Sequence, residues 1–474
     1  MGERIETDVC VVGAGSGGLS FAAGAVQMGA DVVLLEKGEM GGDCLNYGCV
    51  PSKALIAAGH AAYAVRSAKR FGVEAAEPTI DHEKVRAHVK GVIADIAPHD
   101  SQERFEELGV KVIREHGRFS GHRTVVAGDH EIYAKRIIIS TGSVPAVPPI
   151  TGLDAVPFFT NETIFDHGEP IEHLLVIGGG PIGLELAQAH RRLGAKVTVI
   201  EGLKALGNDD PDLAIVVKDR LVSEGIDIHE GALVQSISGD VGSIAIEAER
   251  DGEALKLEGS HLLIAVGRTP NISDLNLEAA DIESGSDGIP VNARMQTSNK
   301  RVFAIGDAAE GYNFTHIAGY HAGIAIRNIL FRLPAKSDYT AVPWVTYTSP
   351  ELAQVGLGEE AARQQYGDVN VLGAKFADND RARAEAETDG MLKVITTSKG
   401  VVVGASMVGE KAGEIIQSWC LPIAKKMKIK DVAGLILPYP TLGEINKRAA
   451  GSYYTPSLFS ERTRKIVRFL LSLG

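Results

Sequence analysis

Residues Asp8 to Gly18 read DVCVVGAGSGG, a short β-branched run followed by glycines in the pattern G-x-G-x-x-G. An alanine-rich stretch typical of a helix follows, and a second apolar run over 32–35 ends on Glu36. In such a unit the loop amides approach a pyrophosphate, and an acid about 20 residues beyond the glycines binds a ribose hydroxyl. The sequence therefore predicts an adenosine dinucleotide site that contains Gly13, Gly15, Gly18 and Glu36.

The same pattern recurs in the middle of the chain. A strand-like run over 174–177 precedes a second G-x-G-x-x-G, a helical stretch over 183–193 follows, and a strand over 196–200 ends on Glu201. One such motif is weak evidence, but two copies with the same surroundings make chance glycine turns improbable. The Glu201 carboxylate would repel a 2'-phosphate, which predicts NAD rather than NADP, although Lys204 nearby weakens this preference. The predicted NAD contacts are Gly178, Gly180, Gly183 and Glu201.

Length and charge restrict the class of protein. The 474 residues exceed the usual size of one hydrophobic core, so several domains are expected. The net charge of -13 disfavours binding to nucleic acid. The chain contains no uncharged apolar run of about 18 residues, and its first ten residues do not resemble a signal peptide. With four cysteines and no metal-ligand spacing, we expect a cytoplasmic protein that binds no metal ion and whose disulfide would be catalytic.

A pair of cysteines follows the first dinucleotide motif. The stretch GGDCLNYGCVPSK contains Cys44, Cys49 and, four residues later, Lys53. Residues five apart on an ideal helix have Cα atoms about 8.6 Å apart, more than the roughly 7 Å that a disulfide tolerates. A bond here needs a distorted helix, and distortion makes a disulfide labile, which suits a redox-active centre. The other two cysteines, Cys10 and Cys420, are predicted to be small buried apolar residues.

With these motifs the sequence resembles the class I pyridine nucleotide-disulfide oxidoreductases, the family of dihydrolipoamide dehydrogenase, glutathione reductase and mercuric reductase. Further resemblance comes from STGSVP at Ser140, GRTPN at Gly267 and RVFAIGDAAEG around Asp307. The resemblance implies an α/β fold with two Rossmann-like dinucleotide-binding domains and a C-terminal α+β dimerisation domain. The predicted parts are an FAD-binding domain (1–149), an NAD-binding domain (150–267), a central segment that completes the FAD site (268–340) and a dimerisation domain (341–474).

The resemblance also implies roles for individual residues. Cys49 matches the thiol that faces the flavin, and Cys44 matches the thiol that exchanges with the substrate. Lys53 matches the lysine beside the flavin N5, with Glu185 as its carboxylate partner. A cation near N5 favours the arrival of hydride, and a buried lysine needs a counter-charge. Further predicted contacts are Lys53, Thr141, Gly142 and Asp307 for FAD, and Gly267 for NAD.

One position departs from the family pattern. The stretch LPYPTLGE has Tyr439 where most members have histidine, and retains Glu444. The resemblance implies a homodimer in which these two residues, predicted as catalytic, face the partner subunit's Cys44. A phenol with a pKa of about 10 is a poorer base near neutrality than an imidazole at about 6.5. We therefore expect faster acceptor reduction from NADH than dihydrolipoamide oxidation. His316 is an alternative proton carrier, although a lone histidine is more often structural.

These features predict an FAD-dependent NAD(P)H:disulfide oxidoreductase that resembles dihydrolipoamide dehydrogenase. Electrons would pass between NAD(H), FAD and the Cys44/Cys49 disulfide to a small or protein-bound disulfide, such as a lipoyl group. One alternative is a metal-ion reductase, because mercuric reductases also carry tyrosine at the position of Tyr439. They usually carry a C-terminal cysteine pair as well, and no cysteine follows Cys420. The other alternative is a flavoprotein subunit that senses or docks NADH without turnover, against which the presence of both cysteines and Lys53 argues.

The last residues, SERTRKIVRFLLSLG, combine basic and apolar side chains. Such a segment could lie on an anionic membrane surface as a peripheral contact. A tail helix packed on its own dimer is the more ordinary interpretation.

Overall fold

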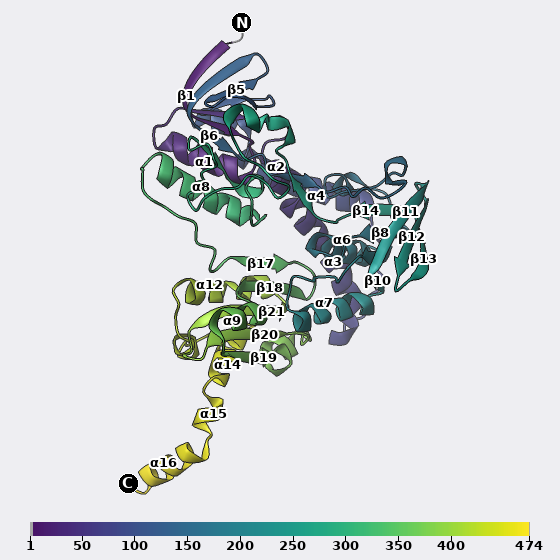
Figure 1. Cartoon of the computed structure of the whole chain (residues 1–474). Coiled ribbons are helices and arrows are strands. Elements are labelled where there is room, and N and C mark those ends of the chain that lie inside the picture. The colour runs from purple at the N-terminus through teal and green to yellow at the C-terminus, as the bar shows by residue number, and fades with distance from the viewer. Residues whose placement is uncertain (1–2, 474) are drawn as a thin grey trace.

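The computed structural model of the chain describes residues 3–473 and arranges them in three lobes (Figure 1). The first lobe contains a seven-stranded sheet. Six strands have the order β3-β2-β1-β6-β5-β4, and the seventh, β16, pairs with the C-terminal end of β6. These strands are β1 (Glu3–Val12), β2 (Val32–Leu35), β3 (Lys111–Ile113), β4 (Arg118–Gly121), β5 (Thr124–Ala127), β6 (His130–Ile139) and β16 (Val302–Ala304). The central strands are parallel and almost fully buried, which explains why they are continuous apolar runs in the sequence.

Two stretches far apart in the sequence build this first lobe. Helix α1 (Ser16–Gln27) follows the first glycine loop and packs against α8 (Thr315–Ile329). Strand β16 adds to the same sheet more than 160 residues after β6. The chain thus leaves the first lobe, forms the second and returns.

The second lobe contains a parallel four-stranded sheet with the order β10-β9-β8-β14 and an antiparallel sheet with the order β11-β12-β13. Helix α6 (Pro181–Arg192) begins two residues earlier than predicted, with a proline in its first turn, where no N–H partner is needed. The remaining elements are β8 (His173–Ile177), β9 (Lys196–Glu201), α7 (Pro211–Ser223), β10 (Ile226–Glu230), β11 (Ala232–Asp240), β12 (Ser243–Arg250), β13 (Glu253–Gly259) and β14 (His261–Ile264).

The third lobe is built on an antiparallel sheet with the order β17-β18-β21-β20-β19. Helices α12 and α14 pack against this sheet, around the fully buried Trp419. The strands are β17 (Pro343–Thr346), β18 (Glu351–Gly356), β19 (Val369–Lys375), β20 (Met391–Thr397) and β21 (Val402–Gly409). The helices are α9 (Glu359–Tyr366), α10 (Asp380–Ala384), α11 (Ala412–Ile415), α12 (Gln417–Ala424), α13 (Ile429–Ala433) and α14 (Glu444–Ser452).

Helix α3 (Cys49–Ser67) leads from the first lobe to the second, where it packs against α4 (His82–Ile96) and α6. It follows the short helix α2 (Gly42–Asn46), and α5 (Gln102–Glu107) follows α4. A two-stranded ladder of β7 (Ser143–Pro145) and β15 (Arg268–Pro270) also connects the lobes. The predicted fold class, two Rossmann-like dinucleotide-binding domains followed by an α+β domain, is confirmed.

Two further helices, α15 (Thr455–Leu458) and α16 (Glu461–Leu471), extend away from the third lobe (Figure 1). Among residues 3–473, no helix is long and apolar enough to cross a membrane.

Candidate redox-active site

The two glycine loops have the same geometry. Gly13 has φ +104°, and a Cβ on Gly18 would lie 1.9 Å from the Gly13 carbonyl oxygen. In the second loop Gly178 has φ +115°, and a Cβ on Gly183 would lie 2.0 Å from the Gly178 carbonyl oxygen. Only glycine allows this close approach of helix and strand. Both loops therefore leave backbone N–H groups at a helix N-terminus, where a pyrophosphate binds.

The acids that follow the two loops are also held alike. Glu36 accepts a hydrogen bond of 2.6 Å from the Ala14 amide, and Glu201 accepts one of 2.8 Å from the Gly179 amide. The second oxygen of each carboxylate accepts from the backbone amide two residues further along the chain, at 2.7 and 2.8 Å. Each oxygen keeps a free lone pair. The two carboxylates are thus fixed beside their loops and can still accept a ribose hydroxyl.

The adenosine end of a flavin dinucleotide fits the first lobe. The Thr141 hydroxyl is buried and has no hydrogen-bond partner among the described residues. It lines a small cavity together with Gly13 and Glu36. A buried hydroxyl without a partner is unusual, and a bound ligand would supply one. The neighbouring Gly142 has φ +68°, which favours glycine at this turn.

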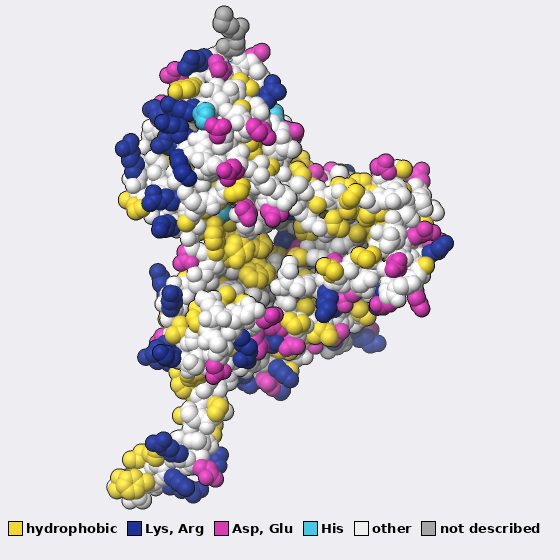
Figure 2. Space-filling view, in the orientation of Figure 1, with side chains coloured by type: hydrophobic (Ala, Val, Ile, Leu, Met, Phe, Trp, Pro, Cys, Tyr) yellow, Lys and Arg dark blue, Asp and Glu magenta, His cyan; other side chains and the backbone are white. Residues whose placement is uncertain are grey.

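A cavity of about 990 Å³ lies where the three lobes meet. Figure 2 shows hydrophobic side chains gathered between the upper and lower lobes, at the level of this cavity. Its volume is at the upper end of the range for small-molecule and cofactor sites. The structure brings together, in its lining, predicted residues from the first glycine loop, α2, α3, the turn after β6, α6 and the turn after β16: Gly15, Cys44, Cys49, Lys53, Gly142, Glu185 and Asp307.

The cysteine pair lies across a break between two helices. Cys44 belongs to α2, Cys49 begins α3, and Gly48 separates them with φ -121° and ψ -107°. The spacing of the cysteines predicts one distorted helix, whereas the structure interrupts the helix completely. A Cβ on Gly48 would lie 2.8 Å from an Asp43 carboxylate oxygen, so glycine is favoured here. Both cysteines are free thiols in the structure, and the lability of their bond stays a prediction.

The two thiols differ in acidity. A hydrogen bond from Cys44 lowers the pKa of Cys49 to about 6, with further stabilisation from Thr315 and the charge of Lys53, against the effect of burial. The Thr315 hydroxyl lies 3.4 Å from the Cys49 sulfur. The same hydrogen bond, together with burial, raises the pKa of Cys44. These opposite shifts favour Cys49 over Cys44 as the thiolate of the reduced pair.

Lys53 and Glu185 form an ion pair at the cavity wall. The Lys53 Nζ lies 2.7 Å from a Glu185 oxygen, and the other oxygen accepts a 2.8 Å hydrogen bond from the Tyr347 amide. The Tyr347 ring centroid lies 4.3 Å from the Lys53 Nζ. Glu185 is buried, whereas 38% of the Lys53 side chain is exposed toward the cavity. This arrangement fixes the ammonium group by a carboxylate and an aromatic face. Sequence reasoning missed Tyr347, because a tyrosine in an unassigned strand end carries no signal.

Asp307 takes part in a second polar network. Its carboxylate accepts a 2.6 Å hydrogen bond from Ser143, which in turn accepts one of 2.7 Å from Arg268. Arg268 also lies 2.9 Å from a carboxylate oxygen of Asp43 in α2. Burial raises the pKa of Asp307. Arg268 was missed in the sequence, although it follows Gly267 (φ +126°) directly in the GRTPN stretch.

Two predicted catalytic residues do not line this cavity. Tyr439 is 71% exposed, and its hydroxyl donates a 3.2 Å hydrogen bond to Asp380, which raises the pKa of the phenol. Glu444 accepts a 3.3 Å hydrogen bond from the Thr441 amide at the start of α14. Both side chains lie on the third lobe, outside the cavity of their own chain.

Two other residues of the sequence analysis do line the cavity. His316 stacks on Phe314 at a centroid distance of 5.2 Å, and burial lowers its pKa, so its imidazole is neutral near pH 7. Cys10 is fully buried in β1, as predicted, whereas Cys420 lies in helix α12 as expected but is only partly buried. Cys420 is half-buried, because it packs partly against the core of the third lobe and also borders the cavity. No group of three or more potential metal ligands lies together among residues 3–473.

The chain contains two nucleotide-binding loops, and its cysteine pair lines the cavity between the lobes. This combination defines the class of nucleotide-dependent thiol-disulfide oxidoreductases. The pyridine nucleotide-disulphide oxidoreductase family matches residues 7–322, and the dimerisation domain of the same family matches residues 342–450. The chain belongs to this family.

Relatives with different names resemble the chain to similar degrees. It is 36% identical to a dihydrolipoyl dehydrogenase from Geobacillus stearothermophilus, over 94% of this chain and 96% of the relative. It is 31% identical to a mercuric reductase from Lysinibacillus sphaericus, over 94% of this chain and 82% of the relative. The solved structure of the Cu(II) complex of the HOCl-induced flavoprotein disulfide reductase RclA from Escherichia coli superposes with a TM-score of 0.84. That structure is 26% identical, over 93% of this chain and 98% of the other.

Membership of the family confirms several predictions. The chain is an FAD-dependent disulfide oxidoreductase that uses a pyridine nucleotide. It carries the dimerisation domain of the family, which supports a homodimer.

Proposed function

We propose that the enzyme uses NADH to reduce a disulfide acceptor, and that it works faster in this direction than in dithiol oxidation. The observation that carries the proposal is the state of Tyr439, whose pKa is raised by its hydrogen bond to Asp380. Oxidation of a dithiol needs a base that removes a proton near neutral pH, and this phenol is a poor one. Reduction of a disulfide needs no base that acts on the acceptor, because its leaving thiolates take up protons.

The cysteines divide the exchange reaction between them. The Cys44 sulfur attacks the acceptor disulfide and forms a mixed disulfide, and the proton of the Cys44 thiol passes to the first acceptor thiolate as it leaves. The Cys49 thiolate then attacks the Cys44 sulfur, which closes the internal disulfide and releases the second acceptor thiolate, and this thiolate takes up a proton from solvent. In the mixed disulfide the Thr315 hydroxyl and the charge of Lys53 still favour the thiolate form of Cys49 for this second step. The carboxylate of Glu185 holds the ammonium group of Lys53 in place beside the pair.

FAD, when bound, supplies the two-electron carrier between the nicotinamide and the cysteine pair. We assign its binding to the first glycine loop, Glu36, Thr141 and Asp307, and that of NADH to the second loop and Glu201. Both oxygens of Glu201 already accept backbone hydrogen bonds, so the carboxylate cannot turn away from a 2'-phosphate. NADH should therefore give a higher kcat/KM than NADPH. As part of the proposal, the enzyme acts in the cytoplasm, where thiols stay reduced between turnovers.

The test compares steady-state rates in both directions at neutral pH. We expect NADH-dependent reduction of lipoamide or of a small disulfide to exceed the oxidation of dihydrolipoamide. The variant Tyr439→His should raise the oxidation rate on the order of 10²-fold, because general base catalysis contributes factors of this size. The matched control is Tyr366→His, which changes another exposed tyrosine of the third lobe and should leave the rate unchanged. Rapid dihydrolipoamide oxidation by the unmodified enzyme would overturn the proposed direction.

The acceptor is tested separately with a panel that contains lipoamide, low-molecular-weight disulfides and Hg(II). The mercuric reductase relatives make the metal ion the principal alternative acceptor. Anaerobic titration with NADH addresses the alternative of a subunit without turnover. A long-wavelength band from the Cys49 thiolate beside oxidised flavin supports the enzyme, whereas bleaching of the flavin alone supports a sensing role.

A further inference from the structure

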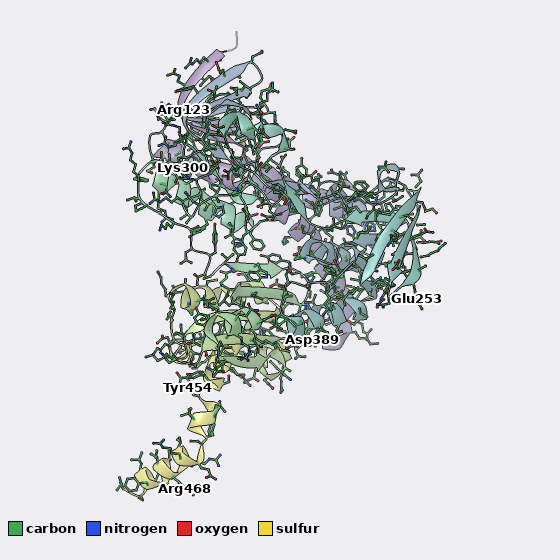
Figure 3. The ribbon with its side chains drawn as sticks, viewed as in Figure 1. Arg123, Glu253, Lys300, Asp389, Tyr454 and Arg468 are labelled. Atoms are coloured by element: carbon green, nitrogen blue, oxygen red, sulfur yellow. The ribbon has the colours of Figure 1, made fainter. Side chains whose placement is uncertain are left out.

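Helix α16 has no buried residue and projects away from the rest of the chain (Figures 1 and 3). Its N-terminus is capped by Ser460, which accepts a 3.2 Å hydrogen bond from the Thr463 amide. The Thr463 hydroxyl also donates to the Ser457 carbonyl at 2.8 Å, which ties α16 to α15. The capping and the contact with α15 therefore define both the start of the helix and its direction relative to α15. Arg468, labelled in Figure 3, lies far from the lobes.

The side chains of α16 separate into two faces. At 100° per residue, the apolar residues gather on one side and most of the charged ones on the other. The exposed apolar side chains of the helix and of the turns at its two ends are Leu458, Phe459, Ile466, Val467, Phe469, Leu470, Leu471 and Leu473. The basic ones are Arg462, Arg464, Lys465 and Arg468. Figure 2 shows this combination of yellow and dark blue at the tip of the molecule.

The charge of α16 is opposite to that of the whole chain. Four basic residues and the single acid Glu461 give the helix a net charge of +3, whereas the chain carries -13. The helix also lies beyond residue 450, where the match to the dimerisation domain ends. Its features are therefore not explained by the fold that the chain shares with its family.

We propose that α16 binds the surface of an anionic lipid bilayer. Eleven residues of helix are about 16 Å long, too short for a hydrocarbon core of about 30 Å, so the helix would lie in the plane of the interface. The apolar face would enter the boundary of the acyl chains, while the arginine and lysine stems lie along it and place their charges at the phosphates. Packing on a second copy of the chain, which carries a net charge of -13, is the competing way to cover this helix, and the experiment below separates the two.

The proposal goes beyond the redox reaction and is tested without it. Full-length holoenzyme is sedimented with phosphatidylcholine vesicles that contain or lack phosphatidylglycerol. We expect binding only to the anionic vesicles, and weaker binding at high salt. The double variant Arg464→Gln, Arg468→Gln should bind about 25-fold more weakly, because each basic residue near an anionic surface contributes about fivefold. The variant Ile466→Gln, Leu470→Gln should bind the anionic vesicles at least about tenfold more weakly, because two apolar side chains no longer enter the acyl-chain boundary.

The matched control is Arg250→Gln, Lys256→Gln, which removes two exposed charges from β12 and β13 and should bind as the unmodified enzyme does. Retained flavin and NADH oxidation show that each variant is folded. Equal sedimentation with both vesicle types, or no effect of the Arg464 and Arg468 changes, would overturn the proposal. Sedimentation velocity without lipid gives a second test. If the α16 variants, but not the control, formed a smaller assembly, a second copy of the chain would cover the helix, and the proposal would be overturned.

Discussion

Cys49 has an acidity that depends on three neighbours from different parts of the chain. Cys44 lies five residues before it, Lys53 four residues after it, and Thr315 comes from α8. The first two relations follow from spacing, so the sequence analysis could assign the pair and its lysine. The contact with Thr315 joins residues 266 positions apart, and no local pattern encodes it. For the same reason Tyr347 and Arg268 were found only in the structure.

At the residue scale, the reactivity of the reduced pair should depend on pH in a defined way. A folded-state pKa of about 6 means that Cys49 is a thiolate above this pH and a thiol below it. Its alkylation by iodoacetamide, measured by peptide mass spectrometry, should rise through about pH 6 and then stay level. An ordinary cysteine would rise through a pKa of about 8.5.

The variant Cys44→Ala removes the hydrogen bond that lowers the pKa of Cys49 most, so its midpoint should move upward. Cys420 in the same protein is an internal control, because burial raises its pKa and its alkylation should still be increasing at pH 8. A midpoint for Cys49 that does not move in the variant would show that Cys44 is not the cause of its acidity.

At the scale of secondary structure, the short helix α2 depends on glycine at its first position. Gly42 has φ +62°, and a Cβ there would lie 2.6 Å from the Cα of Gly15 in the first nucleotide loop. Gly42→Ala should therefore lower the melting temperature and the flavin content, because both the backbone and the loop must shift. The strain of a left-handed residue alone costs roughly 1–2 kcal/mol. Thermal unfolding followed by flavin fluorescence measures the effect.

The matched control is Gly72→Ala. Gly72 has φ +77° but open space around its Cα, so this variant contains the backbone strain without the clash. Equal losses in the two variants would mean that contact with the Gly15 loop is unimportant.

The elements with clear periodicity could be predicted from the sequence. Strands β1, β2, β8 and β9 and helices α1 and α6 are flanked by glycine and acid signals. Their predicted bounds agree with the structure within two residues, except that β1 begins five residues earlier than predicted, at Glu3. The break between α2 and α3 could not be placed, because helix propensity does not show that Asp43 leaves no space for a Cβ on Gly48. The packing of α12 was missed because the orientation of one helix relative to a cavity depends on all three lobes.

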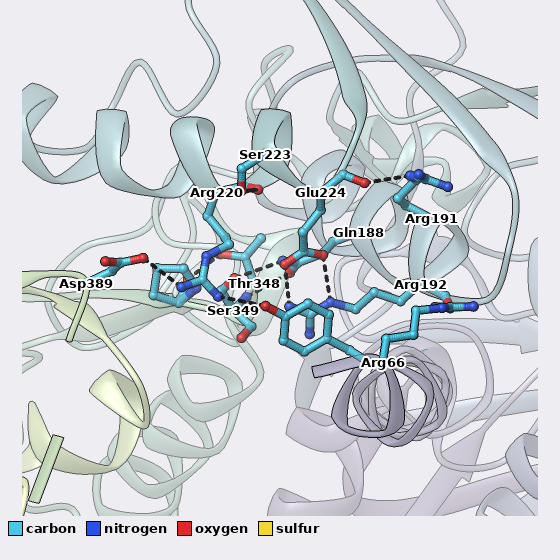
Figure 4. A network of polar contacts seen from close by, with 12 residues as sticks. Arg66, Gln188, Arg191, Arg192, Arg220, Ser223, Glu224, Thr348, Ser349 and Asp389 are labelled. Atoms are coloured by element: carbon cyan, nitrogen blue, oxygen red, sulfur yellow. Dashed lines mark hydrogen bonds and ion pairs between the residues drawn. The ribbon is translucent and has the colours of Figure 1, made fainter. Parts of the chain in front are cut away.

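At the scale of the whole molecule, a buried polar network connects the second and third lobes (Figure 4). Arg192 on α6 binds Glu224 through two hydrogen bonds of 2.8 and 2.7 Å, with 3% and 8% of the two side chains exposed. Gln188 bonds both Glu224 and the backbone of Ser349, which precedes β18. Arg220 binds Asp389 at 2.6 Å. Relative placement of the lobes, and hence the cavity between them, depends on these contacts.

Glu224→Gln should destabilise the protein by about 3–5 kcal/mol, because it leaves the Arg192 charge buried without a counter-charge. Thermal unfolding should show a lower midpoint, and the double variant Arg192→Met, Glu224→Leu should recover part of the loss. The control Glu247→Gln affects an exposed pair with Lys256, whose contribution is at most about 1 kcal/mol. A midpoint that Glu224→Gln leaves unchanged would show that the network does not stabilise the arrangement of the lobes.

The matched contacts of Glu36 and Glu201 have a consequence for protein engineering. Each carboxylate is held by its own loop, and the two loops follow strands of separate sheets. A designer could therefore replace Glu201 and its neighbours with residues that accept a 2'-phosphate and leave the flavin loop untouched. NADPH would then replace NADH as the electron donor, and the cysteine pair and its acceptor site would be unchanged.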